Sequence, residues 1–576
     1  MPKSFARIRL NMLLKSQAFG AVGALVWSVA DMVVSGNMVG VDALAGIAAT
    51  VPVTIGAQFF AQLVYCGSGY VFARCQGAFD HEGAKKAVGL SLELAVAMGL
   101  FTYAAMFFGR DLYLDFVGIS GGAREQAVAY WRWMSVFCAL NPFTMTMWRL
   151  VYADGEMVTT AAGDLVAPFL TVGLSILFTK LTGSAAGAAL GTLVAGVLAD
   201  STMMTHVFRK TNQIVPKWNF SWSGARELMT YSLTDSSTKL CQCAFMTVVN
   251  KLVVLSSSAA YLPVVSVIAL VLEIRSLLDR IGDAYMPIAE MYLGEKNLPR
   301  VRELCRYSFV VALVAGFAFA AVVATGAPQI VALYGIPSAG ADPAPDVYRH
   351  AVTALQISAL VLPLSSLLSF ICSHYLVIGR VGLSVVETVL EEFVLTASCA
   401  AAFCLIWGLD ALWVGLPFGG LVTLLAAVLY GRFCDASRST MLIPESHAPV
   451  LNLSFEPSAE KAVEVRDDAE HFLRRQGVGE KAVGRIMLLV EECAMSVADG
   501  NKASRRAVTV EISFVVDGGE VRMVIRDTGR TQDMTDRDAQ VSNLRSFVLA
   551  GLMSSYEDRR YLNTIGCNRA AFVFPK

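Results

Sequence analysis

Two stretches of the chain decide its fold, because they can be laid on each other without a gap. Residues 28–79 read SVADMVVSGNMVGVDALAGIAATVPVTIGAQFFAQLVYCGSGYVFARCQGAF, and residues 245–296 read FMTVVNKLVVLSSSAAYLPVVSVIALVLEIRSLLDRIGDAYMPIAEMYLGEK. Both begin in an apolar helix, pass a short polar break, run through a second long apolar helix, and reach a glycine, Gly77 or Gly294, before a charged stretch. Doubled units of this kind are common in secondary transporters, with the substrate path between the halves. The pattern predicts a membrane protein of two related halves that moves a solute.

Long apolar runs continue outward from these two stretches and fill the chain up to residue 435. A membrane-spanning helix needs roughly 20 apolar residues. The predicted spans are 17–37, 44–72, 87–108, 128–151, 158–181, 184–207, 228–255, 260–290, 305–335, 350–378, 383–407 and 409–431. We therefore predict an all-α membrane region of twelve helices in two six-helix lobes, 1–226 and 227–435. A linker over 436–448 leads to a separate C-terminal domain over 449–576.

The composition excludes several classes of protein. The chain is 55% hydrophobic and 16% charged, whereas soluble domains carry about 25% charged residues. Its net charge of -1 gives no basic field for nucleic acid. The 12 cysteines form no CxxC pair, so neither a disulfide framework nor a metal site is expected.

The distribution of Lys and Arg predicts the orientation in the membrane. Basic residues gather in the N-terminal segment and in the loops after the second, fourth, sixth and eighth helices, and they are few in the opposite loops. We expect a monomeric, multi-pass protein of the cytoplasmic (inner) membrane, embedded in the lipid bilayer with both termini cytoplasmic. Residues 1–435 contain no GxxxxGK[ST] motif, so transport would draw on an ion gradient or on the gradient of the solute itself.

The membrane region resembles the multidrug and toxic compound extrusion (MATE) family. The resemblance rests on Asp31 in the first helix, on Ala43-Leu44-Ala45-Gly46 and Pro52 around the second, and on GSAAGAALGT over 183–192. It implies a V-shaped bundle of twelve helices that exports amphipathic or cationic small molecules against a proton or sodium gradient. Carboxylates inside a membrane are costly and usually functional.

Asp31 is the predicted coupling residue of the first lobe. The alternative is an acid at a helix end near the outer interface. The family often carries an Asn and, four residues later, an Asp on its fifth helix, where this sequence has Thr171 and Ser175. Thr192 matches a threonine of the sixth helix. The resemblance therefore implies a cation or proton site of Asp31, Thr171, Ser175 and Thr192, and the lost carboxylate weakens the inference of sodium coupling.

The second lobe carries further polar residues within its apolar runs. They are Asn250, Glu273, Arg275, Asp279, Glu387 and Glu391, with Glu392 and Arg280 beside them. The three glutamates at i, i+4 and i+5 could attract cations, or they could pair with Arg275 or Arg280. Arg275 and Asp279 could also pair with each other along one helix. These alternatives stay open.

The C-terminal residues have a different pattern, typical of a small α/β domain. Two amphipathic helices are predicted over 457–475 and 478–500, and two strands over 507–516 and 520–526 flank a tight turn. A helix over 541–556 and a strand over 569–574 complete the predicted domain.

This domain resembles the GHKL-type ATP-binding α/β sandwich, with altered motifs. Glu492 matches the family's general base, Ser496 stands in place of its magnesium-binding Asn, and Asp527 and Gly529 match its adenine-binding box. The lid over 541–545 contains no glycine, so it could not wrap phosphate with backbone N–H groups. ATP and magnesium binding is therefore doubtful, and the domain is expected to regulate the transporter or bind a cytoplasmic protein.

Three functions remain in competition. The leading hypothesis is a secondary antiporter with a cytoplasmic regulatory domain, which is not an enzyme and has no catalytic residues. The first alternative is a membrane sensor whose tail is an active serine kinase. The second is a flippase for a lipid-linked precursor.

Overall fold

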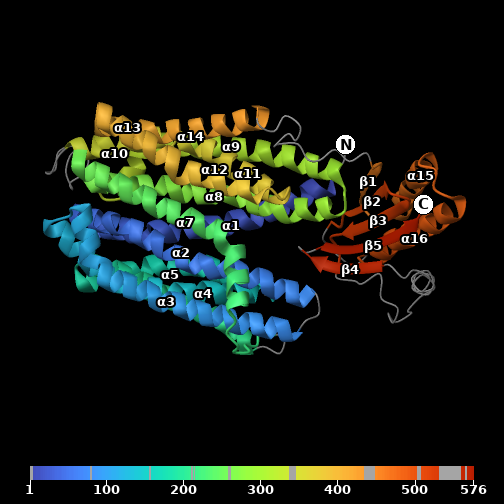
Figure 1. Cartoon of the computed structure of the whole chain (residues 1–576), viewed down its shortest axis with the longest axis horizontal. Helices are drawn as coiled ribbons and strands as arrows, with labels where there is room; N and C mark the ends of the chain where they lie inside the picture. Colours follow the sequence, from blue (N-terminus) through green and yellow to red (C-terminus); the bar gives the residue numbers. More distant parts are fainter. Residues whose placement is uncertain are drawn as a thin grey trace. The chain divides into compact units, whose positions relative to one another are not determined.

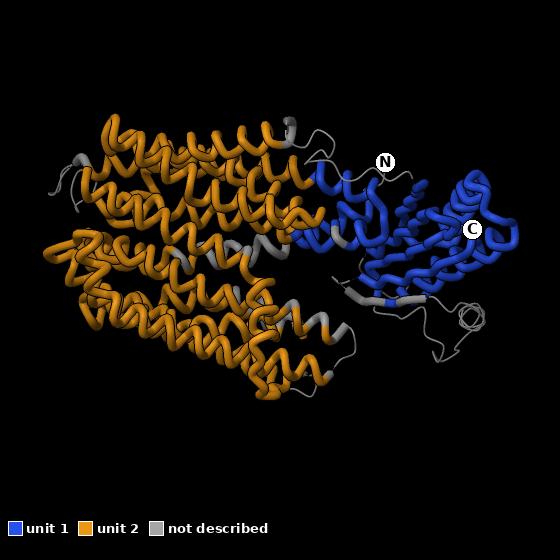
Figure 2. The backbone as a smooth tube through the Cα atoms, in the orientation of Figure 1, with its two compact units in different colours: residues 1–13, 284–307, 437–576 blue, residues 14–283, 308–436 orange. Residues whose placement is uncertain are grey.

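The structure is a computed structural model of the whole chain, and part of the chain can be described in detail. The described residues are 4–77, 81–154, 157–208, 212, 214–256, 261–336, 345–433, 448–501, 507–530, 559–564 and 567–576. Their backbone divides into two compact units, coloured separately in Figure 2. Unit 1 comprises residues 1–13, 284–307 and 437–576, and unit 2 comprises residues 14–283 and 308–436. The predicted division into two membrane lobes and a tail stays a prediction.

The helices of the first half belong to unit 2, except for residues 5–13 at the start of the first helix, which belong to unit 1. They are α1 (Phe5–Met38), α2 (Val41–Gly77), α3 (His81–Val117), α4 (Gly121–Ala153), α5 (Met157–Thr182) and α6 (Ala185–Met204), followed by the short η1 (Thr205–Phe208). α2 packs against α3 and α4, and α5 packs against α6. At Gly191 a Cβ atom would lie 2.4 Å from the backbone nitrogen of Ser175, so glycine allows α5 and α6 to approach closely.

The second half has the same number of predicted spans, but two of them are interrupted. Its helices are α7 (Trp222–Ser256), α8 (Leu262–Gly294), α9 (Leu298–Leu333), α10 (Pro345–Ser358), α11 (Val361–Val377), α12 (Val381–Val389), α13 (Leu395–Trp407) and α14 (Leu409–Phe433). The span predicted over 350–378 is divided between α10 and α11. The span predicted over 383–407 contains a π-helical turn, η3 (Leu390–Val394), between α12 and α13. Such turns often occur at functional sites.

A helix lies at each of the twelve predicted ranges, and most of these helices have membrane-spanning character. Among the described residues, 8 helices are long and apolar enough to cross a membrane. The chain is thus a multi-pass membrane protein, whereas the number of twelve spans stays a prediction.

The C-terminal part of unit 1 is a five-stranded antiparallel sheet (Figure 1). Its strands are β1 (Val450–Phe455), β2 (Val510–Asp517), β3 (Glu520–Asp527), β4 (Arg559–Thr564) and β5 (Cys567–Pro575), in the order β1-β2-β3-β5-β4. Strands were predicted from the sequence at β2, β3 and β5, and the two edge strands, β1 and β4, were not predicted. β1 does alternate, since Leu451 and Leu453 pair with apolar residues of β2 while Asn452 and Ser454 pair with polar ones. The edge strand β4 begins with two arginines and carries no such signal.

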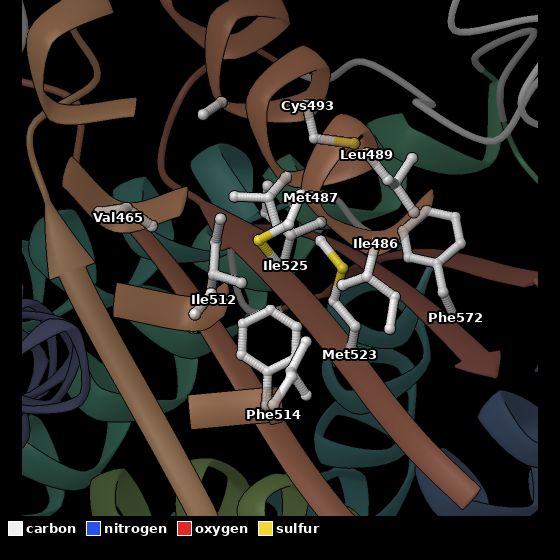
Figure 3. Close-up of a cluster of buried hydrophobic side chains, with 14 of the residues drawn as sticks. Val465, Ile486, Met487, Leu489, Cys493, Ile512, Phe514, Met523, Ile525 and Phe572 are labelled. Carbon is white, nitrogen blue, oxygen red and sulfur yellow. The ribbon is translucent and has the colours of Figure 1, made fainter. Parts of the chain in front are cut away.

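One face of the sheet is covered by the two predicted amphipathic helices, α15 (Ala459–Arg475) and α16 (Glu480–Gly500). Figure 3 shows how Ile486 and Leu489 of α16 meet Ile512, Phe514 and other apolar side chains of the strands. Burial of these apolar side chains stabilises the domain. The helix predicted over 541–556 lies outside the described residues.

Candidate functional site

The carboxylate of Asp31 forms a buried polar site among the helices of the first half. The residue is 6% exposed. Its Oδ1 accepts hydrogen bonds from Thr192 Oγ1 at 2.7 Å and from Ser175 Oγ at 3.3 Å. Its Oδ2 accepts one from the hydroxyl of Tyr130 at 2.9 Å. Four helices, α1, α4, α5 and α6, thus contribute one polar side chain each.

Of the four residues predicted for this site, three come together and one lies apart. Thr171 is buried on α5, one turn before Ser175, and its hydroxyl donates to the carbonyl of Ala167 at 2.9 Å. The sequence analysis missed Tyr130, because a tyrosine among apolar residues of a membrane helix does not differ in pattern from a packing residue. The buried carboxylate predicted at Asp31 could have pointed to it, since such a group needs hydrogen-bond donors from neighbouring helices.

A second buried charge cluster lies in the other half of unit 2. Arg275 of α8 is within ion-pair distance of Glu391 at 2.8 Å and of Glu392 at 2.7 Å. All three side chains are almost fully buried. Glu391 and Glu392 belong to the π-helical turn, which brings these consecutive carboxylates to the same guanidinium. The predicted alternative in which Glu391 pairs with Arg275 is therefore the arrangement seen.

The remaining second-lobe residues have different surroundings. Glu387 is 5% exposed, and both of its carboxylate oxygens are without a hydrogen-bond partner in the part of the chain that the structure describes. Asn250 is buried on α7 and donates to the carbonyl of Ala48 at 3.1 Å, which joins α7 to α2. Glu273 and Asp279 are partly exposed on α8. The predicted residues thus do not form one site.

One carboxylate oxygen of the predicted nucleotide box in the C-terminal domain is engaged in contacts within the domain, and the other, Asp527 Oδ2, is buried without a hydrogen-bond partner among the described residues. Asp527 is 1% exposed, and its Oδ1 accepts from the backbone N–H of Gly529 at 2.8 Å and from Asn568 Nδ2 at 3.0 Å. Burial raises the pKa of the Asp527 carboxyl. A Cβ atom at Gly529 would lie 2.4 Å from Asn501 Nδ2, so the Asn501 side chain packs directly on this turn. Asn501 and Asn568 were not predicted from the sequence.

Glu492 and Ser496 lie one turn apart on α16, and both side chains are partly buried. The predicted lid over 541–545 and Thr531 lie outside the described residues. The described turn at Asp527 is an Asx-type turn, in which a side-chain oxygen accepts from the backbone two residues on.

Comparisons with known proteins find similarity to MATE proteins in part of the sequence and in the fold of the membrane part. The family model described as MatE matches residues 18–186. An inward-facing multidrug resistance MATE family transporter of the MOP superfamily is similar in structure, with a TM-score of 0.66 and 20% identity over 72% of this chain and 95% of that chain. An outward-facing transporter of that description gives a TM-score of 0.60 and 20% identity, over 75% of this chain and 96% of that one.

A third similar structure is a MOP superfamily transporter from Pyrococcus furiosus, described by a reversed polarity of its binding pocket that suggests a different function. Its TM-score is 0.60 at 20% identity, over 75% of this chain and 96% of that chain. No curated protein matched the chain. The membrane part therefore has the fold of MATE multidrug transporters, which are transporters and not enzymes. The resemblance of the C-terminal domain to GHKL proteins stays a prediction.

Proposed function

We propose that this protein is a MATE-type secondary antiporter that exports amphipathic or cationic small molecules in exchange for protons or sodium ions. The observation that carries the proposal is the buried Asp31, held by the hydroxyls of Tyr130, Ser175 and Thr192 from three further helices. A carboxylate inside a membrane bundle is energetically costly, so a protein that carries one usually uses it for function. Helices that meet at one titratable group can exchange between two arrangements when that group binds or releases a cation.

The chemistry of the site is compatible with either coupling ion. Among the four side chains of the site, Asp31 is the one that can bind and release a proton near neutral pH, since the three hydroxyls do not ionise there. The same carboxylate and hydroxyl oxygens are hard ligands of the kind that bind sodium ions well. Arg275 already neutralises Glu391 and Glu392 in part, which makes Asp31 the better candidate for coupling.

We further propose that the C-terminal domain regulates transport and has little or no ATPase activity, with both termini in the cytoplasm. Asp527 is engaged with Gly529 and Asn568, and Asn501 packs directly on Gly529. These contacts give the turn a structural role of its own. A general base at Glu492 would act beside Ser496, whose hydroxyl is too short to replace an asparagine amide as a direct magnesium ligand.

Transport by purified protein in proteoliposomes tests the proposal. A cationic dye is loaded, and its efflux is followed after an imposed proton gradient or sodium gradient. Asp31→Asn should abolish gradient-driven efflux, because it keeps the shape of the side chain and removes the charge. Asp111→Asn is the matched control, since Asp111 is an exposed acid on α3 that pairs with its neighbour Arg110 and lies 4.0 Å from Arg124. Efflux that persists in Asp31→Asn at the wild-type rate refutes the coupling role.

A further inference from the structure

The outer face of the C-terminal sheet, which we define as the face turned away from α15 and α16, is buried although it carries charged residues. Along β2, Ile512 and Phe514 face the helices, so Glu511 and Ser513 point to the outer face. Glu511 and its cross-strand neighbour Arg526 on β3 are both 0% exposed. The second face of an antiparallel sheet is often solvated, so another segment must cover this one.

The turn between α8 and α9 covers it, and this turn belongs to unit 1 together with the sheet. The hydroxyl of Tyr292 donates to Glu511 Oε2, and Arg300 Nε donates to Glu511 Oε1 at 2.9 Å. Arg526 pairs with Glu295, the residue that follows α8. We call these five residues, Tyr292, Glu295, Arg300, Glu511 and Arg526, the docking cluster.

In the docking cluster, each charged residue of the sheet meets a partner from the turn: Glu511 meets Tyr292 and Arg300, and Arg526 meets Glu295. Arg526 Nη1 lies 3.2 Å from Glu511 Oε2, and its guanidinium carbon lies 4.6 Å from the ring centroid of Tyr292. Arg569 of β5 adds a second cation, 2.7 Å from Glu295 Oε1. Glu303 lies 2.6 Å from Arg300 Nη1. Three carboxylates, Glu295, Glu303 and Glu511, are thus matched by three guanidinium groups, Arg300, Arg526 and Arg569, which is the complementarity expected of a specific interface.

Burial makes this interface sensitive to the loss of either side. Burial raises the pKa of Glu511 and lowers the pKa of Arg526 to about 10. Both directions mean that each charge is costly in this position without its partners. Removal of one partner from a buried pair leaves an uncompensated charge, which costs more than the pair contributes. Separation of the turn from the sheet would instead expose the charges of both sides to water. In the docked and in the separated arrangement, therefore, no charge is left buried without a partner.

The backbone of the turn is shaped for this contact. Lys296 has a φ of 60°, in the left-handed region that residues other than glycine seldom adopt. This conformation lets Glu295 reach Arg526 while Lys296 Nζ lies 2.5 Å from Asp517 Oδ2. Asn297 and Asn452 exchange side-chain hydrogen bonds of 2.6 and 3.1 Å. Such local strain is kept where the surroundings hold it in place.

We propose that the outer face of the sheet is a docking surface for the α8–α9 turn of its own chain, and that docking is autoinhibitory. α8 carries both Tyr292 of the docking cluster and Arg275, the partner of Glu391 and Glu392. Alternating access requires helices of the transporter to move against one another, and a segment that binds one arrangement of α8 and α9 stabilises that arrangement. The inference rests on the proposed transport function, and it assigns the regulation to one contact.

A reversible cross-link tests it in the full-length protein. Asn297→Cys and Asn452→Cys are combined in a chain with a protease site inserted within residues 436–448, and the protein is oxidised in proteoliposomes. After cleavage, the C-terminal fragment should stay joined until reductant is added, and each single variant should release it. Dye efflux by the oxidised protein should fall at least about tenfold and recover on reduction, since about 1.4 kcal/mol already changes an equilibrium tenfold.

Undocking should have the opposite effect. Glu295→Gln removes the carboxylate that the turn offers to Arg526 and Arg569, and it leaves Arg526 with Glu511 of the sheet alone. It should raise efflux several-fold, and Tyr292→Phe, which removes one hydroxyl, should raise it less. Absence of the cross-link, or efflux unchanged between oxidised and reduced protein, overturns the inference. If the reduced protein shows no efflux that depends on Asp31, the proposed transport function fails instead, and the cross-link yield still decides whether the turn docks.

Discussion

The hydroxyl of Thr192 lies 2.7 Å from Oδ1 of Asp31, so α6 and α1 meet through a hydrogen bond to a buried carboxylate. Gly191 precedes this threonine and brings α6 against the backbone of Ser175 on α5. The close packing of α6 on α5 therefore depends on Gly191, and the hydrogen bond from α6 to Asp31 depends on the next residue, Thr192. A movement of α6 would change the environment of Asp31, which is the relationship that ion-coupled transport needs.

Thr192→Val should weaken ion coupling without abolishing folding. The substitution keeps the branched shape and removes the donor to Asp31, and hydrogen bonds to charged groups contribute about 1.5–3 kcal/mol. We expect the half-saturating ion concentration for efflux to rise at least about tenfold. Thr171→Val is the matched variant, because Thr171 donates to Ala167 within its own helix, and it should shift the ion dependence far less. Equal shifts in both variants would contradict the geometry of the site.

Arg275→Met should destabilise the membrane part more than Glu391→Gln does. Loss of the guanidinium leaves Glu391 and Glu392 buried without their cation, and an uncompensated buried charge costs about 3–5 kcal/mol. Glu391→Gln keeps the shape of the side chain and leaves Glu392 to pair with Arg275. The thermal unfolding midpoint in detergent measures the difference. A larger loss in Glu391→Gln than in Arg275→Met would show that the cluster is held by other contacts.

The sequence predicted the membrane region well because spanning helices need long apolar runs, which are visible without a structure. It predicted Asp31, Ser175 and Thr192 through a resemblance, but it could not find Tyr130, whose role depends on where α4 lies against α1. The π-helical turn at Glu391 and Glu392 was likewise hidden, since an extra residue in a helix turn leaves no mark in an apolar run. In the C-terminal domain, the alternating pattern of the two strands does not mark Glu511 and Arg526 as buried. Their burial comes from residues 284–307, far away in the sequence.

Asp527→Asn should stabilise the C-terminal sheet near neutral pH. Burial raises the pKa of Asp527, so the folded domain holds this proton at pH values where the unfolded chain has lost it. The resulting stability is complete below the ordinary pKa of an aspartate and is lost as pH rises through the folded value. Asparagine keeps the Oδ1 acceptor for Gly529 and Asn568 and carries no charge. A tenfold difference in proton affinity between the folded and unfolded chain corresponds to about 1.4 kcal/mol of stability.

Hydrogen exchange of the full-length protein measures this effect locally, in peptides that cover β2, β3 and β5. Protection in the wild type should fall as pH rises above the ordinary pKa of an aspartate, after correction for the intrinsic exchange rate, and the fall should be smaller in Asp527→Asn. Asp517→Asn serves as the control, because Asp517 is an exposed acid of the same sheet whose pKa is lowered by Lys296. Identical pH dependence in the wild type and in Asp527→Asn would exclude Asp527 as the titrating group.

The C-terminal domain should bind adenine nucleotide weakly or not at all, and it should hydrolyse none. A GHKL site needs an aspartate oxygen that the adenine amino group can reach. Asp527 Oδ1 already accepts from Gly529 and Asn568, and Oδ2, which has no hydrogen-bond partner among the described residues, is buried. Asn501 packs on the glycine that would otherwise let the backbone approach an adenine ring.

Isothermal calorimetry of the full-length protein with ATP and magnesium should give no heat at micromolar concentrations, and phosphate release should not exceed that of protein-free detergent. Asn501→Ala is the informative variant, because it opens the space beside Gly529 while leaving Asp527 intact. Micromolar binding by the wild type that disappears in Asp527→Asn would contradict the prediction and favour a tail that acts as a serine kinase.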